Sequence, residues 1–289
     1  MKQWDLTHID RRVIYLLVLL ALSIPLALEY ALKPARMEAA ERAFAVVQDL
    51  EAKPGELAFM SLDFGPNSLA ENKPQAEVVL EHLLRKRIPV ALYSQYYLAE
   101  PFLESIPKTV VGRLEKEILG HFWEYGRDWV NLGYRPGGSV MLQNIAKSAD
   151  LAELFKTDAR GNNLRELPIF KGVAGLESVK LLAEFTSLVG GLDSFLQFFQ
   201  KKGYRPFFIH GCTSITIPQA FIYLDSGQLK GLLEGIAGAA WYSLLLERAY
   251  PQRRPDAAQI INTGLGVAHM VVIALVLLGN VGFLIRGRN

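Results

Sequence analysis

Two long apolar segments lie near the opposite ends of the chain. Residues 13–32 carry no charge until Glu29, and residues 260–285 carry no formal charge. Each segment reaches the roughly 20 helical residues that cross the hydrocarbon core of a bilayer. A cleaved signal peptide is the alternative for the first segment, but no small-x-small cleavage site follows it. The pattern therefore predicts one transmembrane helix at each end.

Between these segments, short apolar runs alternate with stretches of helical periodicity. The apolar runs, typical of buried strands, are residues 57–64, 89–94, 128–134, 179–187 and 205–211. The helical stretches are residues 73–87, 106–125, 139–155 and 192–202. Strand–helix–strand spacing of this kind is the βαβ unit. We therefore predict an α/β fold with a mostly parallel, doubly wound sheet of about five strands.

Two further stretches have helical spacing. Residues 35–53 follow the first apolar segment and predict an amphipathic stalk. Residues 226–248 predict a tightly packed soluble or interfacial helix that presents Gly231, Gly235 and Gly238 to another backbone, and an oligomer contact is one interpretation.

The chain therefore divides into three parts. Residues 1–33 form a tail and the first span, residues 34–255 an extramembrane domain with its stalk, and residues 256–289 the second span. Basic residues at the two termini favour cytoplasmic ends and an exported domain by the positive-inside rule; they are Lys2, Arg11, Arg12, Arg286 and Arg288. This orientation is weakened by basic residues at the other end of the second span, next to the domain, namely Arg248, Arg253 and Arg254.

Composition narrows the classes of function. The chain has 31 Lys and Arg against 29 Asp and Glu, a net charge of +2, which argues against a nucleic-acid-binding protein. Cys212 is the single cysteine, so an internal disulfide and a cysteine-based zinc site are excluded. Neither a Walker A motif nor a dinucleotide fingerprint follows a strand. We predict neither cofactor nor metal.

Polar residues gather where the predicted strands end. In open α/β sheets, ligands bind outside the carboxyl ends of the strands. The candidate ligand-binding residues are Asp63, Ser94, Asn131, Arg135, Gly137, Gly138, Ser139, Thr186, Ser187, His210, Thr213 and Ser214. Gly137, Gly138 and Ser139 lie where a helix begins and where free N–H groups favour an anion, but turn and cap chemistry is the better account and needs no ligand. Loops over a sheet are also polar without any ligand.

Two histidines suggest other chemistry. His210, Cys212 and Ser214 offer a nucleophile beside a base, but neighbours in an extended segment rarely have catalytic geometry. His269 lies inside the second apolar segment, where an ionisable residue is costly. It either hydrogen-bonds to another helix or subunit, or lies neutral near the interface.

Residues 125–143 and 224–242, placed between the two apolar ends, resemble a family of two-span prokaryotic membrane proteins. The resemblance covers most of the chain. It implies the two-span architecture and a prokaryotic cell membrane, and it transfers no activity and no catalytic residue.

Three functions remain open. The first is a non-enzymatic structural or interaction subunit of a membrane assembly, with the bilayer and other subunits or further copies of the chain as partners. The second is a domain that binds or senses a small polar ligand or anion at the strand ends. The third is an anchored hydrolase.

Overall fold

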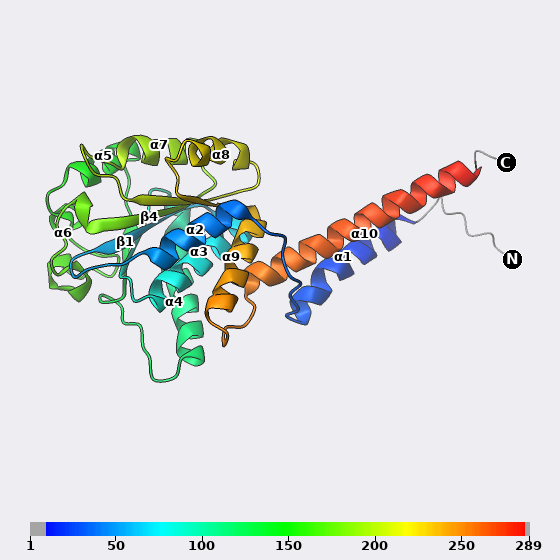
Figure 1. Ribbon diagram of the computed structural model, residues 1–289, viewed down its shortest axis with the longest axis horizontal. Coiled ribbons are helices and arrows are strands. Elements are labelled where there is room, and N and C mark those ends of the chain that lie inside the picture. The colour runs from blue at the N-terminus through cyan, green and yellow to red at the C-terminus, as the bar shows by residue number, and fades with distance from the viewer. Residues whose placement is uncertain (1–9, 287–289) are drawn as a thin grey trace.

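A six-stranded, wholly parallel β-sheet lies at the centre of the larger part of the chain (Figure 1). The computed structural model describes residues 10–286. The strands are β1 (Leu57–Asp63), β2 (Val90–Ser94), β3 (Trp129–Tyr134), β4 (Val179–Thr186), β5 (Phe207–Cys212) and β6 (Gly231–Glu234). Their order in space is β3-β2-β1-β4-β5-β6. The predicted α/β class and parallel sheet are confirmed, and the predicted number of about five strands is wrong by one.

The additional strand lies inside the predicted helix 226–248. Gly231–Glu234 pair with the last residues of β5 as the edge strand β6, and α9 (Gly235–Ala249) begins only after them. A strand of four residues is too short to show a period of its own, so the helical spacing of its neighbours obscured it.

Helices cover both faces of the sheet (Figure 1). One face carries α2 (Glu38–Asp49), α3 (Leu69–Arg85), α4 (Glu100–Glu117) and α9, and the other carries α5 (Ser139–Lys147), α6 (Leu151–Phe155), α7 (Gly191–Phe198) and α8 (Ile217–Asp225). Because side chains alternate along a strand, β1 supplies Met60 to the first core and Phe59 to the second. Single turns of 3₁₀ helix are Pro66–Ser68, Tyr97–Ala99, Leu164–Glu166, Pro168–Phe170 and Leu176–Ser178.

The predicted stalk is wrong. Helix α2 packs against the sheet as part of the domain, and its Ala43 and Val47 are fully buried. Close packing on β6 requires glycine, since a Cβ atom at Gly231 would lie 2.2 Å from the Cα of Ala43. The amphipathic spacing therefore predicted the helix correctly, but its apolar face packs on the sheet of the domain.

Helices α1 (Arg11–Ala27) and α10 (Ala257–Arg286) form a pair that projects from the domain (Figure 1). The backbone of Leu22 approaches Gly264 so closely that a Cβ atom there would lie 3.2 Å from the Leu22 oxygen. Beyond the end of α1, the N–H of Leu32 donates to Thr263 Oγ1 at 2.9 Å. Small residues at the contact thus let the two backbones pack tightly.

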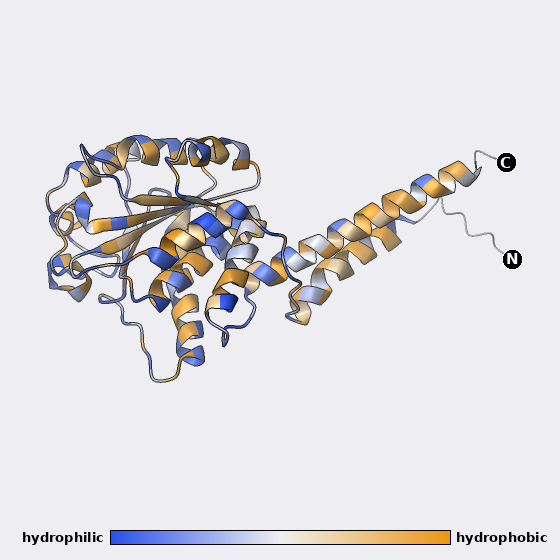
Figure 2. Cartoon of the chain, viewed as in Figure 1, coloured by the Kyte–Doolittle hydropathy of each residue, from blue (hydrophilic) through white to orange (hydrophobic). Residues whose placement is uncertain are grey.

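Within residues 10–286, α10 is the helix that is long and apolar enough to cross a membrane. Only 11% of its most apolar window is buried, unlike the core helix of a water-soluble protein. Helix α1 has 17 residues and ends at Ala27, short of the predicted limit at Leu32, so the predicted N-terminal span is not confirmed. Figure 2 shows that both helices present mainly apolar surface. Lys2 and Arg288, used above for orientation, lie outside the described residues.

A buried cluster of charges joins the domain to the start of α10. Glu81 of α3 accepts hydrogen bonds from Arg253 at 2.8 and 3.0 Å, and it pairs with Arg85 and with Arg113 of α4. Arg253 also pairs with Asp256, directly before α10. Burial by itself raises the pKa of Glu81, but the charges of Arg253 and Arg113 lower it to about 2. The cluster therefore fixes the direction in which α10 leaves the domain.

Candidate functional site

The sheet has a topological switch point between β1 and β4. The chain leaves β1 towards α3 on one face, whereas it leaves β4 towards α7 on the opposite face. The two strands are neighbours, with Asp63 paired to Thr186 at their carboxyl ends. Loops that diverge in this way leave a crevice, which is where ligands bind in open α/β sheets.

A small cavity of about 210 Å³ occupies this crevice. It is lined by Asp63, Gln95, Gly138, Ser139, Leu188, Val189, Gly190, Gly191, Ser194 and Phe195. Helices α5 and α7 both begin here, at Ser139 and Gly191. Some of their first N–H groups donate to the preceding turns, as Val140 does to Gly137 and Gly191 to Leu188, and the helix dipoles favour negative charge at this point. Two helix N-termini therefore lie at one cavity.

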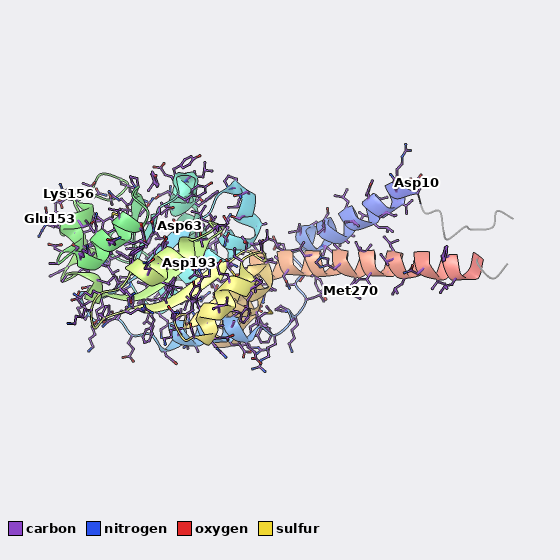
Figure 3. All side chains as sticks on the ribbon, turned by 90° about the horizontal axis from the view of Figure 1, so that it is seen from above. Asp10, Asp63, Glu153, Lys156, Asp193 and Met270 are labelled. Atoms are coloured by element: carbon purple, nitrogen blue, oxygen red, sulfur yellow. The ribbon has the colours of Figure 1, made fainter. Side chains whose placement is uncertain are left out.

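Asp63 is the acidic residue at this cavity, and it lies in the interior of the domain (Figure 3). Its carboxyl group accepts hydrogen bonds from the Ser61 hydroxyl (2.5 Å), the Ser94 hydroxyl (3.0 Å) and the N–H of Gln95 (2.7 Å). Burial, and secondly the nearby Glu184, raise the pKa of Asp63 from 3.8 to about 7. Asp63 therefore holds its proton to a higher pH than an exposed carboxyl group does.

A row of polar side chains crosses the sheet beneath the cavity. Register pairs Tyr93 with Ser61, Ser61 with Glu184, and Glu184 with His210 across four adjacent strands. All four are buried, and Glu184 Oε2 contacts His210 Nδ1 at 3.1 Å. The other oxygen, Oε1, has no hydrogen-bond partner within residues 10–286. A Cβ atom at Gly191 would lie 3.1 Å from it, a tight contact that favours glycine where α7 begins above Glu184.

The structure brings six of the predicted site residues to the switch point. Ser94 binds the Asp63 carboxylate, while the Thr186 hydroxyl and the Ser187 N–H donate to the Asp63 carbonyl at 3.0 and 3.4 Å. Gly138 and Ser139 line the cavity opposite. The prediction that the strand ends form a polar rim therefore holds for this part of the edge.

Other predicted residues do not reach the cavity. His210 is buried beneath it, and Thr213 and Ser214 lie beyond β5. Ser214 binds Glu71 of α3 through its hydroxyl (2.5 Å) and its N–H (2.9 Å). Cys212 is fully buried, and burial raises the pKa of its thiol to about 12. Burial therefore argues against Cys212 as a nucleophile, and the hydrolase hypothesis stays a prediction.

The remaining rim residues stabilise the chain around β3. Asn131 accepts a hydrogen bond from the N–H of Gly133 at 2.8 Å, and Arg135 donates to the carbonyls of Leu132 and Thr157. Gly137 adopts a φ of 123°, which favours glycine, in the turn before α5. The side chains of Asn131 and Arg135 are thus hydrogen-bonded to neighbouring backbone, and neither they nor Gly137 line the cavity.

The three glycines predicted as an oligomer contact make contacts within the chain. Gly235, at φ 54°, leaves no room for a side chain beside Glu71 and Ser214, and a Cβ atom at Gly238 would lie 2.8 Å from the Leu233 carbonyl carbon. These glycines, like Gly231, serve packing inside the domain. His269 lies exposed on α10.

Sequence reasoning missed residues that complete the site. Gly190, Gly191 and Ser194 line the cavity, whereas the periodicity predicted only a helix that contains Ser194. Glu184 was also overlooked, although a single acidic residue inside an apolar strand is a usable signal because an unpaired buried charge is costly. No group of acidic, histidine or cysteine side chains suited to a metal occurs among residues 10–286.

Comparison of the chain with protein-family models, with curated proteins and with solved structures gave no match. The resemblance to a two-span prokaryotic family therefore stays a prediction.

Proposed function

We propose that this protein is a membrane-anchored domain that binds a small polar molecule in the cavity between β1 and β4. The observation that carries the proposal is the convergence of two helix N-termini on a cavity whose acidic residue is the buried Asp63. The N–H groups suit an anionic oxygen group, such as a carboxylate or phosphate. Asp63 suits a hydrogen-bond donor on the same ligand. At about 210 Å³, the cavity admits only a small molecule or a small part of a larger one.

The anchoring half of the proposal is supported by the α1/α10 pair. Helix α10 has the length and composition of a span, and α1 lies against it with exposed apolar side chains such as Tyr15, Leu19 and Leu26. In this proposal both helices lie in the bilayer and both termini emerge on one side. The cytoplasmic placement of the termini, and the export of residues 34–255, stay predictions.

Asp63 makes binding of a fully ionised anion depend on pH. The ionised carboxylate repels the anion, whereas the protonated form donates a hydrogen bond to it. The charged or titratable groups near Asp63 are Glu184 on β4 and Tyr93 on β2. Because the pKa of Asp63 is about 7, affinity should fall about tenfold between pH 6 and pH 8 if only the protonated form binds.

Sulfate tests this proposal, because its charge is constant over this range. We expect the full-length protein in a neutral detergent to bind sulfate by calorimetry, more tightly at pH 6 than at pH 8. Asp63→Asn should remove the pH dependence while retaining the affinity seen at pH 6, since the amide carries no charge.

A matched pair of variants locates the binding site. Ser139→Asp puts a carboxylate at the cavity, where it also suits the N-terminus of α5, and we expect it to abolish sulfate binding. Val140→Asp adds the same charge to the next residue, which is 61% exposed and does not line the cavity, and it should bind nearly as the wild type does. Equal binding by both variants, or no binding by the wild type, would contradict the proposal.

The function as a structural subunit of a membrane assembly stays a prediction. One reason for it, a glycine-lined contact with another subunit, is removed because Gly231, Gly235 and Gly238 contact their own domain.

A further inference from the structure

A groove of about 990 Å³ lies where the domain meets α1 and α10. It is distinct from the cavity between β1 and β4. Helix α4 forms one wall with Lys108, Arg113, Lys116 and Glu117, and Glu29 and Arg254 belong to the segments that connect to α1 and α10. The groove therefore lies between the domain and its proposed anchor.

Positive charge predominates in this groove, with four basic and two acidic side chains in its lining. Three of these charges are already paired: Glu117 with Arg85 at 2.7 Å, Arg113 with Glu81 at 2.6 Å, and Lys108 with Glu104 at 3.2 Å.

Lys116 and Arg254 differ from these residues. Both are exposed, and neither has an ion-pair partner within residues 10–286. Apart from the carboxylate of Glu29, they are the unpaired charges of the lining among residues 10–286, and two such cations in one groove can engage an anion together.

Two residues of the groove lie next to the ends of α1 and α10, which places the groove at the expected bilayer surface. Glu29 follows α1 by two residues, and Arg254 precedes the first residue of α10, Ala257, by three. The exposed apolar surface of both helices begins close by, with Leu26 on α1 and Leu265 on α10. A groove attached to these connections lies beside the phospholipid headgroups once the helices are in the membrane.

We infer that this groove binds the anionic headgroup of a membrane phospholipid, with Lys116 and Arg254 as ligands of its phosphate. Arginine offers a planar pair of donors to phosphate and lysine a compact charge, so the two suit one phosphodiester. Basic groups beside an anionic bilayer surface are attracted to it, which adds to the pairing with a single phosphate. The inference rests on the membrane position of α1 and α10 in the proposed function, and it is independent of the cavity at Asp63.

Lipid retention by the full-length protein tests the inference. The protein is purified in a neutral detergent and offered phosphatidylglycerol or phosphatidylcholine, and bound lipid is counted by native mass spectrometry. We expect the wild type to retain phosphatidylglycerol at least tenfold better than phosphatidylcholine. The variant Lys116→Gln/Arg254→Gln should lose this preference.

The control variant, Lys147→Gln/Lys202→Gln, also removes two exposed positive charges. Lys147 and Lys202 line a separate cavity of about 380 Å³ beside α5 and α7. This variant should keep the wild-type preference. Equal loss in the two variants, or no preference in the wild type, would overturn the inference.

Two further arms separate the sources of failure. Inorganic phosphate should not displace phosphatidylglycerol, and displacement at millimolar phosphate would mean a site for the free ion instead. Reconstitution into phosphatidylcholine liposomes, followed by flotation, tests the anchor separately. Protein that floats but lacks the lipid preference overturns this inference alone, whereas protein that does not float overturns the membrane position on which it rests.

Discussion

Asp63 and Glu184 lie on neighbouring strands, buried at the switch point. Each could be located in the sequence as an acidic residue within or at the end of an apolar run, and Asp63 was predicted as a site residue. Their proximity could not be predicted, because the pairing of β1 with β4 joins segments more than 110 residues apart. The raised pKa of Asp63 follows from burial and from that pairing.

Asp63→Asn should become more stable relative to the wild type as pH rises from 5 to 8. Between pH 3.8 and about 7, folded Asp63 keeps a proton that the unfolded chain has lost, so its contribution to stability falls as pH rises. Asparagine has no such cost. At about 1.4 kcal/mol per pKa unit, the relative change should be a few kcal/mol.

Chemical denaturation in detergent at both pH values measures this change. Comparing each variant with the wild type cancels other titrating groups, such as Glu234, whose pKa burial also raises to about 7. Asp225→Asn, at an exposed position of α8, should show the same stability difference at both pH values. A constant difference for Asp63→Asn would show that Asp63 is ionised in the folded protein.

Among the individual elements, periodicity identified most helices and strands. The predictions failed for the short strand β6, and for α2, whose apolar face packs on the sheet and does not form a stalk. The predicted helix 139–155 is two helices, because Asp150 begins α6 by accepting a hydrogen bond from the N–H of Glu153. The cluster around Glu81 was not predicted, since Arg253 lies 172 residues away along the chain.

Arg253→Met should destabilise the contact between α3, α4 and the start of α10. It removes both hydrogen bonds to Glu81 and the ion pair with Asp256, leaving buried carboxylates with less compensation. Breaking a buried pair of this kind costs about 3–5 kcal/mol. Denaturant unfolding of the full-length protein measures the loss.

Arg254→Met serves as the control for this variant, since Arg254 is exposed and should change stability by at most about 0.5 kcal/mol. Similar effects of the two substitutions would mean that the buried cluster contributes little. Acid tests the same cluster, because the stabilisation from Glu81 should be lost as pH falls from 4.5 towards 2.

In the whole molecule, the α/β domain is joined to a pair of apolar helices, and the start of α1 and the end of α10 lie at the far end of that pair (Figure 1). Met270 lies on α10, well outside the domain (Figure 3). Without a bilayer, this pair would expose a large apolar surface to water, which soluble monomers rarely do.

We expect the full-length protein to stay in the membrane fraction after alkaline carbonate extraction. Ile273→Arg/Leu277→Arg places two charges on exposed positions of α10 and should reduce the retained fraction, because each arginine costs about 2.5–3.5 kcal/mol at the centre of a span. Leu119→Arg, at a site in the domain that is 86% exposed, should leave retention unchanged. Release of the wild type by carbonate would contradict the anchor.

Local sequence patterns were sufficient to predict the alternation of strands and helices, the parallel α/β class and the long apolar C-terminal segment. These follow from local periodicity and from the length of apolar runs, which neighbouring residues specify. The three-dimensional fold was needed to show that α2 lies on the sheet, that 231–234 is a strand, and that α5 and α7 begin at the cavity lined by Asp63. Such facts depend on which distant strands pair and on which face each connection takes, and no local pattern carries that information.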